Sequence, residues 1–403
     1  MSYSLAAKYL RARVWIAVAA GCAPWLLWLG GLVSTGGKRD LANNLVGADH
    51  LAFYHAAKLI RDGESRHLYD YEWLQLTDYQ KAIVGWEWHG FEAYRNPPFY
   101  ALLYLPTVGL SYYTSFVIWS VVGLALLALA VVLLKPERPV RAVLWALTFY
   151  PVFATVSFGQ NTFISLVIFA GVYRLLSSEQ RFAAGLVAGL LFFKPQLLLG
   201  LFVWWAFEPR RYWRAWAGVF VTGAALAALS WLAVPDGSRA FVDSLRANAG
   251  FGGFGMWNVV NPKALFALLF PKLPEVYWTL AATCSVAGIA VAWRVKRATG
   301  APVAVMFPVA VFLSLWASPH ALVYEWALLV AAAVVLWSRF PASRDCWFCL
   351  FALAWVALAV TVPLAKMQDN MKETVILQVG VPLLGLVGWL AARELARAPG
   401  AQA

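Results

Sequence analysis

The chain has 403 residues, of which 62% are hydrophobic and 13% are charged, and its mean hydropathy is +0.66. This composition is too apolar for an ordinary soluble domain, so it predicts one polytopic membrane domain over residues 1–403. The formal net charge of +12 comes from short basic clusters between apolar runs, and we interpret it as a signal of membrane topology, not of nucleic-acid binding.

The first apolar run, residues 14–33, follows Arg11 and Arg13 and contains no charged residue. Because basic residues tend to stay on the cytoplasmic side, we expect the N-terminus to lie inside and this helix to carry the chain out. A cleaved signal peptide is the alternative. The run is long for such a segment and no clear Ala-x-Ala site follows it, so we expect the span to be retained.

Residues 34–95 form the longest polar region and the first of two expected external loops. Two stretches in it have helical character, at about residues 49–61 and 71–84. Tyr, Trp and His are common there, as suits short amphipathic helices at the membrane surface. Residues 99–110 follow Asn96-Pro97-Pro98 and are too short for a clear crossing, so we interpret them as a re-entrant or outer-leaflet helix.

Apolar runs that could cross a bilayer as helices follow along the rest of the chain. They are residues 112–134, 142–157, 162–176, 215–234, 276–293, 302–317, 321–337, 347–364 and 375–391. Residues 235–274 form the second external loop, with a glycine-rich part from Gly250 to Gly255 and an amphipathic part at 262–270.

Residues 182–207 would read as one apolar helix without Lys194 and Pro195 near the middle. Proline disfavours an unbroken helix, and a lysine at the bilayer centre costs about 2.5–3.5 kcal/mol. Two short legs that meet at Lys194 explain both residues. This hairpin returns the chain to the inside.

The distribution of charge supports this scheme. Inner segments hold 18 Lys or Arg and 5 Asp or Glu, whereas outer segments hold 13 and 14, with Lys194 and Glu325 left inside the membrane. The asymmetry predicts about twelve crossings with both termini cytoplasmic, in an inner or plasma membrane. It places Asp49, Gln160, Lys194 and the Ser318-Pro319-His320 break together on the extracytoplasmic side.

These breaks carry different chemical types, as an active site does, whereas a pore repeats like residues along a path. The four cysteines lie in or beside expected spans. Cys346 and Cys349 have the spacing of a metal or redox pair, but no histidine or second cysteine pair lies near them in the sequence, so we interpret them as packing residues and predict no metal site.

The motifs occur in a particular order: Asp49 with Tyr54 and Ala56-Ala57, Gly63, Leu68-Tyr69, Asn96-Pro97-Pro98, Gly159-Gln160-Asn161, Lys194-Pro195, and Ser318-Pro319-His320-Ala321-Leu322-Val323-Tyr324. This order resembles glycosyltransferase family 87, over about residues 46–324. The resemblance implies the all-α GT-C fold, a bundle of about twelve transmembrane helices with short external helices. Two residues depart from the family pattern, His50 where Phe is frequent and Glu325 where Asp is more usual.

The resemblance also implies a function. Members include enzymes that transfer mannose from a polyprenyl phosphate, here to a lipid- or glycan-linked acceptor outside the cytoplasm. Asp49 would be the general base. The departing phosphate needs positive charge, for which Lys194, His320 and Arg95 are the candidates. A base opposite the leaving group implies inversion.

The remaining residues expected to bind substrate are His50, Tyr54, Gln160, Asn161 and Tyr324. Each site residue has a plainer alternative: Asp49 and His320 could cap helices, and His50, with His55, could orient neighbours. Lys194 and Arg95 could reach lipid headgroups, and Gln160 and Asn161 could satisfy the backbone at their break. Glu325 at a helix start is interpreted as polar support. External tryptophans such as Trp86 and Trp88 could stack on a sugar or pack on isoprenoid.

No glycine-rich nucleotide-binding fingerprint and no external carboxylate pair with metal spacing appear in the sequence. We therefore expect a lipid-linked donor and no cofactor, with a divalent ion left open. A transporter or lipid flippase is the main alternative, but it predicts matching broken helices in both halves, and the Lys194-Pro195 break has no counterpart. A non-enzymatic assembly partner would leave the varied outer residues unexplained.

Overall fold

The computed structural model describes residues 3–40, 44–247 and 255–397, and their regular elements are all helices. The α-helices are α1 (Tyr3–Ser34), α2 (Ala48–Arg61), α3 (Tyr71–Leu76), α4 (Tyr79–Val84), α5 (Pro98–Ala101), α6 (Tyr112–Leu133), α7 (Pro139–Leu147), α8 (Tyr150–Phe158), α9 (Thr162–Ser177), α10 (Arg181–Gly189), α11 (Leu199–Ala206), α12 (Pro209–Ala233), α13 (Pro235–Ala247), α14 (Pro262–Leu269), α15 (Pro274–Thr299), α16 (Val303–Trp316), α17 (Leu329–Arg339), α18 (Arg344–Asn370) and α19 (Gly380–Leu395). The 3₁₀ helices are η1 (Ser65–His67), η2 (Leu102–Thr107), η3 (Leu190–Phe193), η4 (Pro195–Leu198), η5 (Met256–Asn258), η6 (Val323–Leu328) and η7 (Pro341–Ser343). Most of the expected glycine-rich part of the second loop lies outside the described residues.

Five helical stretches among the described residues are long and apolar enough to cross a membrane, which makes this a multi-pass membrane protein. They are Ala12–Ser34, Tyr112–Leu133, Pro209–Ala233, Pro274–Thr299 and Pro341–Asn370, and the bent pair α7 and α8 would be a sixth. Four further apolar helices are shorter: Thr162–Ser177, Arg181–Phe193, Pro195–Ala206 and Val303–Trp316. Twelve crossings therefore stay a prediction.

The span expected over residues 142–157 is not one continuous helix, because α7 and α8 meet at an angle of 71°, and it would cross the membrane only as a broken span. Pro151 lies at the second position of α8. It has no amide hydrogen to donate to Leu147, and its ring crowds that carbonyl, so the helix breaks there. Trp25 Nε1 donates to the Leu147 carbonyl and Trp355 Nε1 to the Thr148 carbonyl, each at 2.9 Å. Side chains from two other helices thus satisfy the backbone at the bend.

The other polar breaks lie where the sequence predicts them. Gly159 separates α8 from α9 with φ at +69°, Lys194 separates η3 from η4, and Ser318-Pro319-His320 lies between α16 and η6. The stretch at 71–84 is two helices instead of one, because Asp78 has a left-handed backbone between them. Residues 99–110 form α5 and η2, which are both short.

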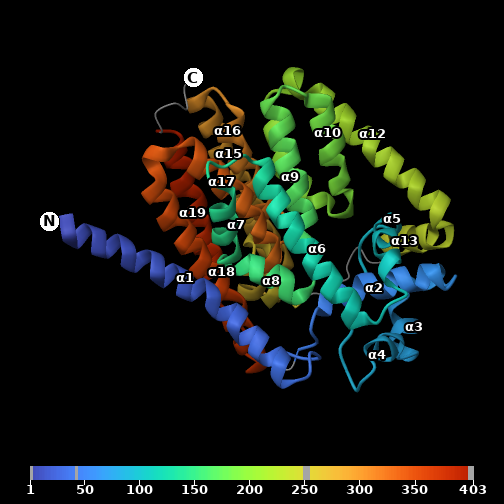
Figure 1. Ribbon diagram of the computed structural model, residues 1–403. Coiled ribbons are helices and arrows are strands. Elements are labelled where there is room, and N and C mark those ends of the chain that lie inside the picture. The colour runs from blue at the N-terminus through green and yellow to red at the C-terminus, as the bar shows by residue number, and fades with distance from the viewer. Residues whose placement is uncertain (1–2, 41–43, 248–254, 398–403) are drawn as a thin grey trace.

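Figure 1 shows α2, α3, α4, α5 and α13 gathered at one end of the bundle, with the C-terminal end of the chain at the opposite end. Ion pairs tie together three segments that the charge count places inside. Glu137 Oε1 lies 3.2 Å from Arg344 Nη2, and Asp345 Oδ1 lies 2.7 Å from Arg13 Nη2. These contacts fit the expected inner side of the protein.

The broken hairpin that carries Lys194 is held by close helix packing. A Cβ atom added to Gly185 of α10 would collide with the Ala215 carbonyl of α12, and one added to Gly200 of α11 would collide with the Ala310 carbonyl of α16. Small residues let helix backbones approach closely in membranes. The two legs of the hairpin therefore sit firmly against α12 and α16, and Lys194 is fixed between them.

Candidate active site

Asp49 lies in the first turn of α2, which begins after Gly47 with φ at +67°. The Tyr112 hydroxyl donates to the carbonyls of Val46 and Gly47, both at 2.7 Å, and fixes this start. Gly47 is the N-cap residue and no side chain caps the helix. The alternative reading of Asp49 as a capping residue therefore has no hydrogen bond to support it.

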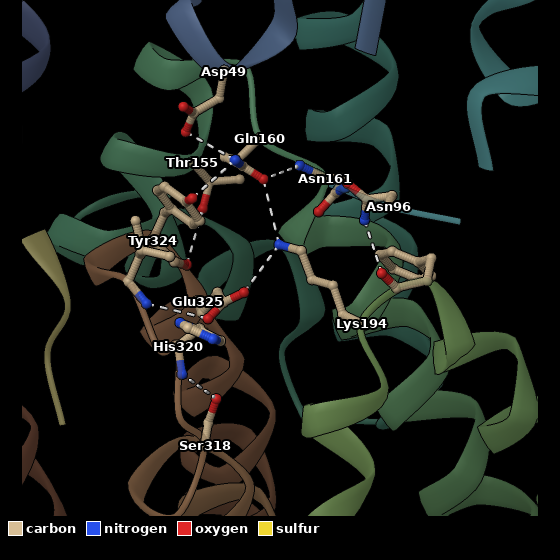
Figure 2. Close-up of polar contacts among 12 residues, drawn as sticks. Asp49, Asn96, Thr155, Gln160, Asn161, Lys194, Ser318, His320, Tyr324 and Glu325 are labelled. Atoms are coloured by element: carbon tan, nitrogen blue, oxygen red, sulfur yellow. Dashed lines mark hydrogen bonds and ion pairs between the residues drawn. The ribbon is translucent and has the colours of Figure 1, made fainter. Parts of the chain in front are cut away.

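Gln160 stands at the centre of the cluster (Figure 2). Its Nε2 donates to Asp49 Oδ2 at 2.8 Å and to the Tyr324 hydroxyl at 2.9 Å. Its Oε1 accepts from Lys194 Nζ at 3.4 Å. One amide thus connects a carboxylate, a phenol and an ammonium group that come from distant parts of the chain.

Lys194 also forms a buried ion pair with Glu325. Lys194 Nζ lies 3.1 Å from Glu325 Oε1, and the two side chains are 10% and 2% exposed. The other oxygen of Glu325 accepts the Leu322 amide at 3.2 Å. A charge out of water needs such a partner, so Glu325 does more than the polar support expected of it: it directly balances the ammonium group.

The environment of Asp49 suits proton transfer near neutral pH. Burial raises the pKa of its carboxyl to about 6, against the Gln160 hydrogen bond and the charge of Lys194, which both lower it. A general base works best when its pKa lies close to the operating pH. Asp49 can therefore be ionised at neutral pH and still accept a proton.

Two residues expected to bind substrate make their hydrogen bonds elsewhere. His50 Nε2 lies 2.9 Å from Ser115 Oγ of α6, and the His50 side chain is fully buried among aromatic rings. The Tyr54 hydroxyl donates to the Leu110 carbonyl at 2.6 Å. Their polar atoms hold α2 against its neighbours, so the structure does not bring these groups into the Gln160 cluster, and orienting neighbours is the reading of His50 that fits.

Asn161 and His320 lie beside the cluster. Asn161 is 1% exposed and its side chain lies by the Tyr100 hydroxyl. Its backbone N–H donates to Gln160 Oε1 at 3.2 Å. His320 is half-buried in the break after α16. Burial, together with the charges of Lys263 and Arg95, lowers the pKa of His320 to about 4. A neutral imidazole can donate one hydrogen bond to an anion but supplies no charge.

Arg95 and two residues that the sequence analysis missed complete the surroundings. Arg95 interacts electrostatically with Tyr324, Glu92 and His320. The charge of Lys263, in the first turn of α14, lowers the pKa of His320. Burial raises the pKa of Glu92 to about 8, with the charge of Asp49 adding to this effect. Glu92 lies in an irregular segment with no motif, so only its neighbourhood in space reveals it.

The cysteines and the acidic groups show no metal centre in the described part of the chain. All four cysteines are free thiols. No group of three or more His, Cys, Asp or Glu side chains in residues 3–40, 44–247 and 255–397 could hold a metal ion.

The comparisons with known proteins add one finding. The model of glycosyltransferase family 87 matches residues 94–319, more than half of the chain, and this range contains Gln160 and Lys194. No curated protein and no solved structure matches the chain. The match confirms the resemblance seen in the order of the motifs: the chain belongs to glycosyltransferase family 87, and it is a membrane glycosyltransferase.

Proposed function

We propose that this protein transfers a sugar, with mannose the first choice, from a polyprenyl phosphate to a lipid- or glycan-linked acceptor on the extracytoplasmic side of the membrane. The observation that supports this most is the bridge through Gln160, which holds Asp49 and Lys194 within reach of one small substrate. A proton acceptor and a cation for phosphate are the two groups that such a transfer needs.

The proposed step is a single displacement. The acceptor hydroxyl gives its proton to Asp49 while its oxygen bonds to the anomeric carbon of the donor. The bond from that carbon to the phosphate oxygen breaks, and the electron pair leaves with the polyprenyl phosphate. Attack from the side opposite the phosphate inverts the anomeric centre, by the same geometry that defines inverting glycosidases.

The positive groups have distinct tasks in this proposal. Lys194 would share its charge between Glu325 and the donor phosphate, and Arg95 would add a second cation from the Tyr324 side. His320 would donate a hydrogen bond as a neutral ring. Charge that grows on the phosphate oxygens during bond breaking is what preorganised donors stabilise.

The test is a transfer assay with purified protein. It uses farnesyl phosphates that carry β-mannose, β-glucose, β-galactose or β-arabinose, with a panel of octyl glycosides as acceptors. The proposal predicts transfer from one of these donors and an α-linked product by proton NMR. Absence of transfer from every donor, or a product with the donor's own anomeric configuration, would contradict it.

A further inference from the structure

The segment from Glu92 to Pro97 runs beside the cluster without regular secondary structure, yet buried side chains fix its backbone. The side-chain amide of Gln80 makes two hydrogen bonds to the backbone of Glu92. Gln80 Oε1 accepts from the Glu92 N–H at 2.9 Å, and Gln80 Nε2 donates to the Glu92 carbonyl at 2.6 Å. The Tyr71 hydroxyl donates to the Tyr94 carbonyl at 2.9 Å. An irregular segment anchored in this way holds its side chains in fixed positions.

The same segment is tied to both halves of the cluster. Gln80 Nε2 lies 2.9 Å from His55 Nδ1 on α2, the helix that carries Asp49. Asn96 Nδ2 donates to the Phe193 carbonyl at 2.8 Å, and Phe193 directly precedes Lys194 in the sequence. The segment is therefore positioned by the elements that supply the base and the ammonium group.

The side chains of Glu92 and Arg95 supply none of these anchoring hydrogen bonds. The carboxyl of Glu92 interacts electrostatically with Asp49 and Arg95, and Arg95 interacts with Tyr324. The Glu92 carboxyl is therefore close enough to Asp49 for their charges to interact, and the proposed reaction uses only the Asp49 carboxyl. Carboxyl groups are strong hydrogen-bond partners for hydroxyls, and a sugar carries adjacent hydroxyls.

The two carboxyl groups also differ in protonation. The pKa of Asp49 is raised to about 6 and that of Glu92 to about 8, chiefly by burial in both cases. At neutral pH, Asp49 is mostly ionised and Glu92 mostly protonated, so one accepts a proton while the other can donate a hydrogen bond. Paired acidic groups held at different pKa values commonly have different roles.

We propose that Glu92 binds the acceptor sugar, through a hydroxyl adjacent to the one that Asp49 deprotonates, and thereby selects acceptors that carry this second hydroxyl. The inference rests on the proposed function, because it assigns the acceptor side of the same site. The ligand class is a glycoside with two neighbouring free hydroxyls.

The test compares Glu92→Met, which removes the polar group at similar length, with Glu92→Gln, which keeps a hydrogen-bond donor. Glu87→Met is the control, since Glu87 lies near the same segment with its side chain 73% exposed. The substrates are the farnesyl-phosphate sugar and the octyl glycoside that the wild type uses best. We expect Glu92→Met to raise the acceptor KM about tenfold, Glu92→Gln to raise it less, and the donor KM to stay unchanged in both, in line with the loss of one hydrogen bond.

Monodeoxy versions of the octyl glycoside locate the contact. One deoxy position should cost the wild type about tenfold in kcat/KM, as expected for one lost hydrogen bond, and should cost Glu92→Met less than about twofold because the partner is already gone. If Glu92→Met does not fold, Glu92→Leu, which also lacks the polar group, replaces it in the deoxy series. An unchanged acceptor KM, or equal losses for donor and acceptor, would overturn the assignment of Glu92.

The two proposals fail in different ways. Transfer that survives Asp49→Asn, or a wild-type protein that uses no donor and no octyl glycoside, counts against the proposed function and takes this inference with it. An inactive Asp49→Asn beside a Glu92→Met variant with normal acceptor kinetics removes only the role of Glu92.

Discussion

Gln160 is the residue through which the charges of the site act on one another. It donates to Asp49 and Tyr324 and accepts from Lys194, so its side chain is held on three sides. Its hydrogen bond lowers the pKa of Asp49, which burial raises to about 6. The amide is therefore placed to keep the carboxylate ionised at neutral pH.

This role gives a pH prediction. A base must be ionised to act, so activity is lost as the pH falls through the pKa of Asp49, at about 6. In Gln160→Leu the hydrogen bond that stabilises the carboxylate is missing, so the pKa rises and the acidic limb of kcat/KM moves to higher pH. A pH–rate profile checks this. An acidic limb at the wild-type position, even with a lower maximum rate, would contradict the link between the two residues.

Lys194 gives a second prediction at this scale. Its ammonium group contacts both Gln160 and Glu325. Lys194→Ala would remove the charged contact that we propose with the donor phosphate, so the donor KM should rise about tenfold or more while the acceptor KM changes little. Arg239→Ala is the control, because Arg239 lies on α13 with its side chain 68% exposed. An unchanged donor KM would argue against contact with phosphate.

At the scale of elements, the turn between α8 and α9 positions Gln160. Gly159 has φ at +69°, and an added Cβ would lie 2.6 Å from the Cβ of His50 on α2. Only glycine fits a left-handed turn pressed against another helix in this way. Gly63 has φ at +80° but no atom within 4 Å of an added Cβ, so it offers a matched comparison.

We expect Gly159→Ala to lose most of its activity and to melt below Gly63→Ala. The left-handed backbone should lower the free energy of unfolding of both variants by about 1–2 kcal/mol. Only Gly159→Ala must also displace His50 and hence Gln160. Melting in detergent and transfer rate together measure the difference. Equal melting temperatures and equal activities in the two variants would show that the close approach does not position the site.

The sequence predicted the breaks that a glycine, a lysine or a Ser-Pro pair marks in an apolar run. Gly159, Lys194 and Ser318 each mark a break that the structure contains. The bend between α7 and α8 was missed, although Pro151 inside the apolar run was its signal. Asp49, Gln160, Lys194 and Tyr324 come together, whereas His50 and Tyr54 do not, because residues on one short helix point to different sides.

Glu92 and Lys263 could not have been found in this way. Glu92 lies in an extended segment without periodicity, and its position depends on Gln80, Tyr71 and Asn96. Such anchors form between residues far apart in the sequence, and a single chain gives no pattern for them. The ion pair between Lys194 and Glu325 could not be predicted from the sequence either, because it forms only when two distant helix breaks lie side by side.

At the scale of the whole molecule, the account depends on which end of the bundle faces outward. Glu87 follows α4, which Figure 1 shows at the same end of the bundle as α2, whereas Glu137 pairs with Arg344 among the segments expected inside. Their side chains are similarly exposed, at 73% and 70%. This match makes them a suitable pair for labelling.

In intact cells, a membrane-impermeant maleimide should label Glu87→Cys and leave Glu137→Cys unlabelled, while both react after the membrane is opened. The reason is the excess of basic residues in the segments around Glu137, which predicts that this end lies in the cytoplasm. The unsubstituted protein measures reaction of its four native cysteines. Labelling of Glu137→Cys alone would reverse the proposed orientation and place the cluster in the cytoplasm.

The most direct test of the account as a whole is the rate of sugar transfer by Asp49→Asn, measured with saturating farnesyl-phosphate sugar alongside donor binding by calorimetry. Loss of the base should lower kcat by about 10²–10⁴-fold, while the donor, held by Lys194 and its neighbours, still binds. Transfer by Asp49→Asn within a few-fold of the wild-type rate would contradict the assignment of Asp49 as the base.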